Sequence, residues 1–282
     1  MALSFGGSGF SAQKSIGYMS KTKSLMDKSM ERIASGNKIL TAGDDPGGLA
    51  VSMRLKNELS TLVGAKDRVG NAKSYVEAQS TALQSVADIV SEMQTIKINY
   101  DASSDSDERD AYESQFQDLR AQLNNLKGES INTQPLFNRG DDLQISTTAD
   151  GSGSTIELTD IDLDDALTIA SLGVDLADNT DGTTLDDISD GDLTAVFDKV
   201  TGLATEVAGD QSTLGFASDY LSNMSTNLEA AHGRIMDVDI AEESANYAKL
   251  TMQYEAAAAA VAQANVAMGA VLDLLLTSVN RD

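Results

Sequence analysis

Apolar side chains recur at alternating steps of four and three residues between positions 250 and 275. This spacing places them in one row along a helix, and such a row packs lengthwise against another helix. Many positions around the row hold alanine, which buries little area, and burial stabilises by only about 25 cal/mol per Å². We therefore predict a helix that needs partners on several sides, some of them supplied by other copies of the chain. The row consists of Leu250, Tyr254, Ala257, Val261, Ala264, Met268, Val271 and Leu275.

A second amphipathic helix is predicted from Ile16 onward. Gly36 ends it, because glycine readily takes the positive φ of a helix C-terminus. Asp44, Asp45 and Pro46 then supply a cap and a first helical turn, which predict another helix running toward Leu59. The candidate packing residues of the first helix are Met19, Met26, Met30 and Ile33.

Heptad rows predict three more helices in the interior of the chain. The longest is expected from about Lys66 to Tyr100, and a shorter one before Gly128. A further helix has leucine or valine every seven residues and is expected to pause at His232 and Gly233. The rows are Val69, Val76, Leu83 and Val90; Tyr112, Phe116, Leu119, Leu123 and Leu126; and Val207, Leu214, Leu221 and Leu228.

The pattern changes between 141 and 198, where acidic residues abound and Lys and Arg are absent. Residues 143–147 and 155–158 alternate between apolar and polar around a Gly- and Ser-rich turn, which predicts a β-hairpin. Residues 175–192, rich in Asp, Gly and Thr, are expected to form a surface loop. We interpret the acidic residues mainly as a solvated face.

Charge distribution predicts how the ends of the chain are arranged. Basic residues outnumber acidic ones in 1–43, whereas acidic residues dominate 235–282, so these two segments are expected to pair. The fold class is therefore mainly α: a long antiparallel coiled-coil rod with paired terminal helices and a small β-hairpin region at the outer end. The expected domains are an inner coiled coil (1–43 and 235–282), a helical rod (44–140 and 193–234) and a variable surface region (141–192).

Composition excludes several classes of function. The net charge of -24 argues against nucleic acid as a partner, because phosphate binding needs a basic surface. Without cysteine and with the single histidine His232, the usual thiol, zinc and Ser/His chemistries lack their residues. No apolar run is long enough to cross a membrane, and the first ten residues do not read as a secretory signal peptide. We expect no enzyme activity, no cofactor and no membrane insertion.

Several segments resemble bacterial flagellin. Residues 29–39 and 42–50 are similar to its N-terminal signature, with a Ser-Gly helix end followed by the Asp44-Asp45-Pro46 cap. Residues 234–239 and 261–265 are similar to its C-terminal segments, and 134–138 to the loop before its hairpin. The resemblance covers about 11–160 and 195–276, while the first ten residues lack the usual opening of the family.

The resemblance implies a secreted structural subunit that polymerises into the flagellar filament and carries torque for swimming. It implies export through the flagellar type III apparatus without cleavage, an extracellular location, and an export chaperone, cap and hook-junction proteins as partners. The two rows near the chain ends would then form the subunit packing of the filament interior. Outer hydroxyls are often glycosylated in the family, and the candidates are Ser152, Ser154, Thr180, Thr183 and Thr184.

Three alternatives remain open from the sequence. A hook-filament junction protein would share the terminal helices without forming long polymers. An acidic adhesin could bind calcium through Asp160, Asp162, Asp164 and Asp165, although this stretch lacks the glycine and final glutamate of an EF-hand. An enzyme inserted in the variable region is disfavoured, because that region is short and contains no histidine.

Overall fold

The computed structural model describes residues 6–147, 155–171, 173–178 and 182–279. The chain is mainly helical, as predicted, with five helices of 22 residues or more, one short helix and short antiparallel strand pairs in the described residues. It divides into two compact units: Met1–Asn57 with Leu228–Asp282, and Glu58–Asn227. The first unit combines an early and a late segment of the chain, whereas the second is one continuous segment.

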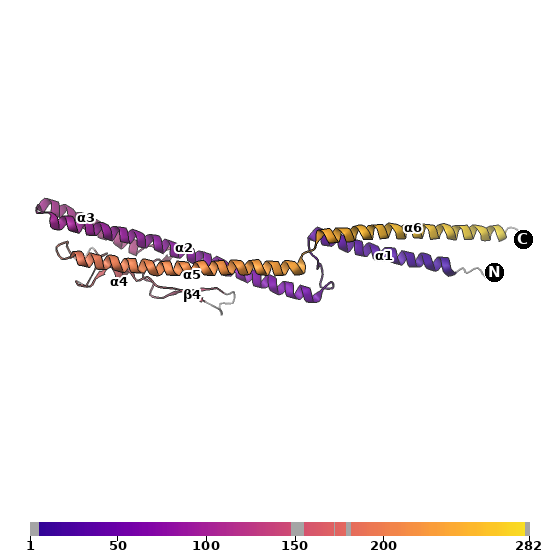
Figure 1. The fold of residues 1–282 in the computed structure, drawn as a ribbon, viewed down its shortest axis with the longest axis horizontal. Coiled ribbons are helices and arrows are strands. Elements are labelled where there is room, and N and C mark those ends of the chain that lie inside the picture. Colours follow the sequence, from indigo (N-terminus) through magenta and orange to yellow (C-terminus); the bar gives the residue numbers. More distant parts are fainter. Residues whose placement is uncertain (1–5, 148–154, 172, 179–181, 280–282) are drawn as a thin grey trace. The chain divides into compact units, whose positions relative to one another are not determined.

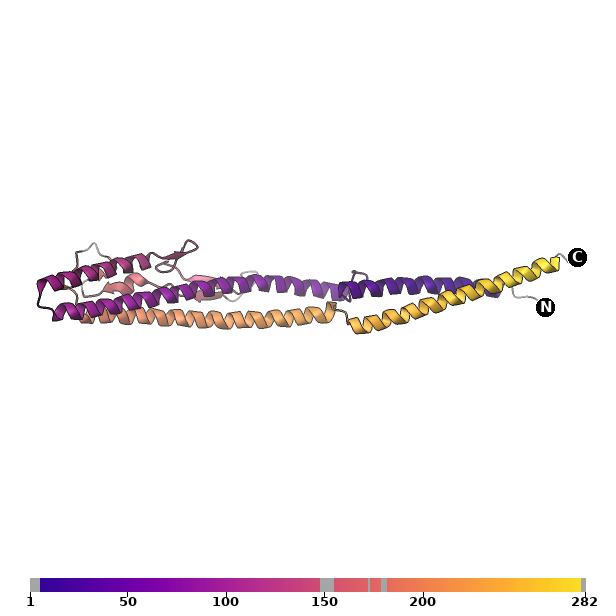
Figure 2. The same cartoon turned by 90° about the horizontal axis from the view of Figure 1, so that it is seen from above.

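In the first unit, helix α1 (Gly6–Ser35) packs along helix α6 (Ile240–Val279). The two helices run antiparallel and lie side by side in both views (Figure 1, Figure 2). This confirms the predicted pairing of the terminal helices. At their base a small bridge joins Asn37 to Asp237, and the Val238 amide donates to the Gly36 carbonyl at 2.9 Å. Gly36 has φ +72°, the left-handed conformation that its position at the helix end predicts.

Helix α2 (Pro46–Ala102) is one continuous helix of 57 residues. Asp45 caps its start, because its carboxylate accepts the amide of Gly48 at 2.9 Å. The prediction of two helices, one ending near Leu59 and one beginning near Lys66, was wrong. The apolar row continues through the supposed break, where Leu62 packs against the core and Ala65 is fully buried.

The core of the second unit lies among α2, α3 (Ser106–Lys127) and α5 (Asp190–Met236). The predicted rows of α2 and α5 face this core. α5 does not pause at His232 and Gly233 as predicted; the Gly233 carbonyl accepts the Asp237 amide at 2.8 Å, so the helical turn is completed. Fully buried members of the rows are Val69, Val76, Leu83, Val90, Phe116, Leu123 and Leu214.

Short elements fill the chain between α3 and α5. Strands β1 (Ser130–Ile131) and β2 (Gln134–Pro135) form a tight turn. The predicted hairpin is confirmed as β3 (Leu143–Ser146) and β4 (Thr155–Leu158). It lies beside α2, where the side chain of Arg68 donates to the Ser146 carbonyl at 3.2 Å. Helix α4 (Leu163–Leu167) and the strand pair β5 (Thr168–Ile169) and β6 (Val174–Asp175) follow.

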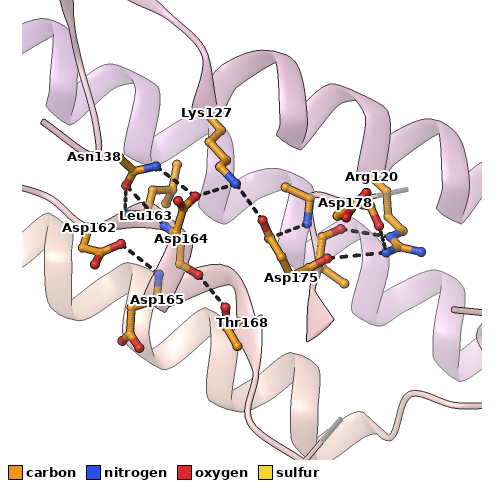
Figure 3. Close-up of polar contacts among 12 residues, drawn as sticks. Arg120, Lys127, Asn138, Asp162, Leu163, Asp164, Asp165, Thr168, Asp175 and Asp178 are labelled. Atoms are coloured by element: carbon orange, nitrogen blue, oxygen red, sulfur yellow. Dashed lines mark hydrogen bonds and ion pairs between the residues drawn. The ribbon is translucent and has the colours of Figure 1, made fainter. Parts of the chain in front are cut away.

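In the described residues between β6 and α5, the acidic segment has neither helix nor strand and exposes most of its polar side chains, as expected of a surface loop, but several of its apolar side chains are buried in the core. Leu176, Ala177 and Leu185 are completely buried, and Ile188 nearly so. Their burial depends on α3, whose Arg120 donates hydrogen bonds to backbone carbonyls of this segment (Figure 3).

Candidate assembly surface

The first unit has very little core of its own. Among its described apolar side chains only Ile39 and Leu250 are buried, in contrast to the continuous core of the second unit. Large apolar side chains remain exposed on α1, on α6 and on the start of α2: Ile16, Tyr18, Leu25, Met30, Val51, Met53, Ile240, Met252, Val266 and Met268. Exposed apolar side chains that gather on a unit with so little core are typical of a site of contact with another protein surface.

The structure places most of the row on α6 along the α1/α6 pair. Leu250 is buried, and Tyr254, Val261 and Ala264 are half-buried, as is Ala257. Met268 is 39% exposed. Val271 and Leu275 belong to α6, but their side chains lie outside the described part of the structure.

The candidate residues on α1 fall into two groups. Met19, Met26 and Ile33 are half-buried, and the Thr251 hydroxyl lies 3.7 Å from the Met26 sulfur across the pair. Met30 points away and is 57% exposed. The rows therefore contribute to the contact between α1 and α6 within one chain, while exposed side chains beside them remain available for further contacts.

Sequence reasoning missed the exposed apolar residues that lie off the two rows. Tyr18 and Leu25 on α1, and Met252 and Val266 on α6, belong to this group. The available signal was that apolar residues on these helices cover more than one face, which is typical of a helix with several partners.

An ion pair joins α1 to the turn that follows it. Lys28 forms an ion pair with Asp44, whose other oxygen accepts the amides of Leu40 and Thr41 at 3.2 Å each. The hydrogen bond from Lys28, together with these amides, lowers the pKa of Asp44 to about 2. The Asp44 carboxylate therefore connects the turn between α1 and α2 to α1.

A second carboxylate ties α6 to α1. The buried Ser29 hydroxyl donates to the carboxylate of Glu243, and the Arg32 guanidinium lies 3.7 Å from it. Hydrogen bonds from Ser29 and Asn246, with the charge of Arg32, hold the pKa of Glu243 below its usual value. Both contacts join segments more than 200 residues apart in the sequence.

The aspartates considered for calcium binding are engaged separately. Asp162 caps α4 through the amide of Asp165 at 2.9 Å, and Asp164 lies 2.5 Å from the Lys127 ammonium (Figure 3). Asp160 accepts the amide of Gly140 at 2.7 Å. In the described ranges no three metal-ligating side chains gather at one point.

Lys127 holds two parts of the acidic segment together. Its ammonium also lies 2.7 Å from the carboxylate of Asp175 (Figure 3). Burial lowers the pKa of Lys127, but the hydrogen bonds with Asp164 and Asp175 outweigh it and raise the pKa above its usual value. Many acidic side chains of this segment therefore hold its fold, instead of forming only a solvated face.

The glycosylation candidates differ in accessibility. Thr184 is exposed, but its hydroxyl donates to Asp187 at 2.9 Å, and Thr183 is buried. Ser152, Ser154 and Thr180 lie outside the described residues.

Of the helices in the described ranges, none is long and apolar enough to span a bilayer.

Comparisons with known proteins match most of this chain. Residues 10–140 match the bacterial flagellin N-terminal helical region, and residues 194–275 match the bacterial flagellin C-terminal helical region. A flagellin of Halalkalibacterium halodurans is 32% identical over 253 residues, covering 88% of this chain and 91% of that protein. A flagellin of Bacillus subtilis is 24% identical, with 94% and 97% covered.

The fold also resembles a solved structure. A hook-associated flagellar protein of Vibrio parahaemolyticus superposes with a TM-score of 0.57 at 17% identity, covering 69% of this chain and 100% of that one. At this identity the likeness concerns the fold alone.

Proposed function

The chain belongs to the bacterial flagellin family, and we propose that it is the structural subunit of an extracellular flagellar filament built from copies of itself. The observation that carries this proposal is the first unit, whose helices pair but leave large apolar side chains exposed. Neighbouring copies would supply the missing half of that core. Because a helical polymer repeats one contact along an open lattice, a single chain suffices to build a long filament.

The three domains expected from the sequence give the proposed layers of the filament. Segments 1–43 and 235–282 would form the inner coiled coil, and 44–140 with 193–234 the surrounding helical shell. Segment 141–192 would face the solvent, in keeping with its many carboxylates. The role of such a subunit is mechanical: it transmits torque, and no catalytic step is proposed.

The residues proposed to pack in the filament interior are those of the two predicted rows. Their half-buried members keep part of their surface free of the α1/α6 contact. The export route through the flagellar type III apparatus, the export chaperone, and the cap and hook-junction proteins as partners are proposed from family membership.

The filament subunit is favoured over a hook-filament junction protein. The sequence relatives matched over nearly their full length are flagellins, whereas the likeness to the hook-associated protein is one of fold. The two functions differ in one measurable property, the length of the polymer.

Seeded polymerisation tests the proposal. Purified chain is mixed with short filament fragments, and growth is followed by electron microscopy and sedimentation. Long tubes are expected from the wild type, together with a rise in helicity by circular dichroism. A wild-type chain that stays monomeric with seeds would overturn the filament assignment.

A charge placed in the α6 row tests the surface. Val261→Asp puts a carboxylate among apolar side chains, where an unpaired charge is costly, and should leave soluble chain that does not elongate seeds. Ala111→Asp adds the same charge at an exposed position of α3 and should polymerise normally. Equal polymerisation of both variants would remove Val261 from the interface.

A further inference from the structure

Two aromatic side chains stand exposed on α5. Phe216 is 76% and Tyr220 is 63% exposed, and the four-residue spacing puts them on one face of the helix. The chain has only 6 Phe, 7 Tyr and no Trp, and Phe116 and Phe137 are fully buried in the core. Aromatic residues dominate the energetics of contact surfaces, so an exposed pair of them indicates a docking surface.

The pair faces away from the core of its own unit. Leu214 and Leu221 on the same helix are buried, and Ser218 lines the gap toward α2. Since each helical residue turns by about 100°, positions two residues before and after Ser218 lie roughly opposite to it. Phe216 and Tyr220 therefore cannot bury themselves against α2 of the same chain.

The same unit contains a groove of about 610 Å³ beside α2. Strand β3 contributes Leu143 and Ile145 to its wall, and the β1/β2 turn contributes Ile131. Tyr75 closes the floor and is held in place by its hydroxyl, which donates to the Pro135 carbonyl at 2.6 Å. The groove is largely apolar and already formed.

The β1/β2 turn shapes the rim of this groove. Asn132 and Thr133 both adopt positive φ, at 50° and 67°. Positive φ at both central residues is the requirement of the tightest hairpin turn. It is uncommon for a β-branched residue such as Thr133. The turn presents Ile131 at the surface, where it is partly exposed.

Each surface carries one charged residue, and the two charges are opposite. Asp219 is exposed between the two aromatic residues, and Arg68 stands at the groove, where its side chain also contacts the Ser146 carbonyl. We propose that Phe216 and Tyr220 of one copy dock into the groove beside α2 of a second copy, with Asp219 approaching Arg68. This deepens the proposed function and rests on it, because it names one contact of the polymer.

The proposed contact joins two different surfaces, so it can repeat from copy to copy without forming a closed ring. The aromatic pair and the groove are different surfaces of the same unit, so each copy offers one of each to its neighbours. Such heterologous contacts generate open helical polymers when their rotation does not close a ring. The contact would therefore extend the filament through the second unit, in addition to the contacts of the first.

Truncation of the aromatic pair tests the contribution to assembly. The full chain with Phe216→Ala and Tyr220→Ala should need at least about a tenfold higher concentration for seeded elongation than the wild type, since truncated hot-spot residues have effects of this size. Ile98→Ala removes a similarly exposed apolar side chain elsewhere on α2 and should stay within about twofold of the wild type. Equal concentrations for both variants would overturn the proposal.

Charge exchange tests the pairing of the two surfaces. Arg68→Glu and Asp219→Arg should each weaken elongation, whereas the double variant should recover part of it. Additive losses in the double variant would count against contact between these residues.

Cross-linking tests the geometry directly, because the natural chain has no cysteine. A full chain with Tyr220→Cys and Ile131→Cys, treated with a short bis-maleimide, should give a ladder of covalent multimers. The matched pair Tyr220→Cys and Ile98→Cys should not. Filaments without the ladder would overturn the docking proposal alone. A ladder without filaments would support it and overturn the filament assignment, and the absence of both would overturn both.

Discussion

The buried Arg120 should decide whether the acidic segment stays folded. Its side chain is 1% exposed and comes from α3. The guanidinium donates to the carbonyls of Leu176 and Thr183, both at 3.0 Å. It also donates to the carbonyl of Asp178 (Figure 3). We expect Arg120→Met, which keeps the length and removes the donors, to open this segment from the core.

The magnitude follows from two opposing effects. Removing the charge recovers its desolvation cost, but it leaves buried carbonyls without these donors, at about 1–3 kcal/mol for each such group. The unsatisfied carbonyls should outweigh the recovered desolvation, so we expect Arg120→Met to lower the local unfolding free energy by about 3 kcal/mol.

Amide hydrogen exchange of the full chain measures this effect. The Leu176 amide, bonded to the Leu167 carbonyl at 2.9 Å, should exchange more than 100-fold faster in Arg120→Met, since each 1.4 kcal/mol is tenfold. Lys199→Met is the control, because its ion pair with Asp165 at 3.4 Å is exposed and such pairs contribute about 0–1 kcal/mol. Unchanged exchange at Leu176 in Arg120→Met would refute the reasoning.

Three further predictions concern the first unit. Gly48→Ala places a methyl group 2.4 Å from a carboxylate oxygen of the capping Asp45, so it should displace the cap and destabilise the unit by about 1 kcal/mol in chemical denaturation. The pKa of Asp44 is lowered from 3.8 to about 2, so its contact with Lys28 stabilises above pH 3.8 and is lost as pH falls toward 2; Asp44→Asn should remove this part of the acid transition in circular dichroism. Leu250→Ala removes a buried side chain and should lower the melting temperature of assembled filaments by several degrees.

The helices and the hairpin could be predicted from the sequence because their signals are local. Heptad spacing fixed which side of α2 and α5 is buried, and Val76, Leu83 and Leu214 lie in the core as expected. Alternation around a Gly-rich turn was enough for the pairing of β3 and β4. Errors occurred at the ends of helices, where breaks were expected between Leu59 and Lys66 and at His232 and Gly233. In both places the helix continues, because neighbouring turns keep their packing or hydrogen bonds.

Burial of the apolar residues in the acidic segment could not be predicted, because the residues that contact them lie elsewhere in the chain. Leu176 and Leu185 lie in short apolar groups between aspartates, so neither a helical nor a strand period was visible. Their burial depends on Arg120, which is 56 residues away from Leu176 in the sequence. Arg120 follows Leu119 of the α3 row directly in the sequence, and its charge gave no sign that it would be buried with backbone carbonyls as its partners.

The candidate assembly surface illustrates a general limit of periodicity. A row of apolar residues shows that one face of a helix is covered, but it does not say which protein surface covers it. On α6 the structure resolves this question in part: Leu250 and Val261 lie along α1 of the same chain, whereas Met252 and Val266 remain exposed. Because α1 covers only one side of α6, the alanine-rich helix is left with the unfilled sides that a polymer contact requires. The exposed residues off the row, more than the row itself, are therefore where substitutions should separate folding from assembly.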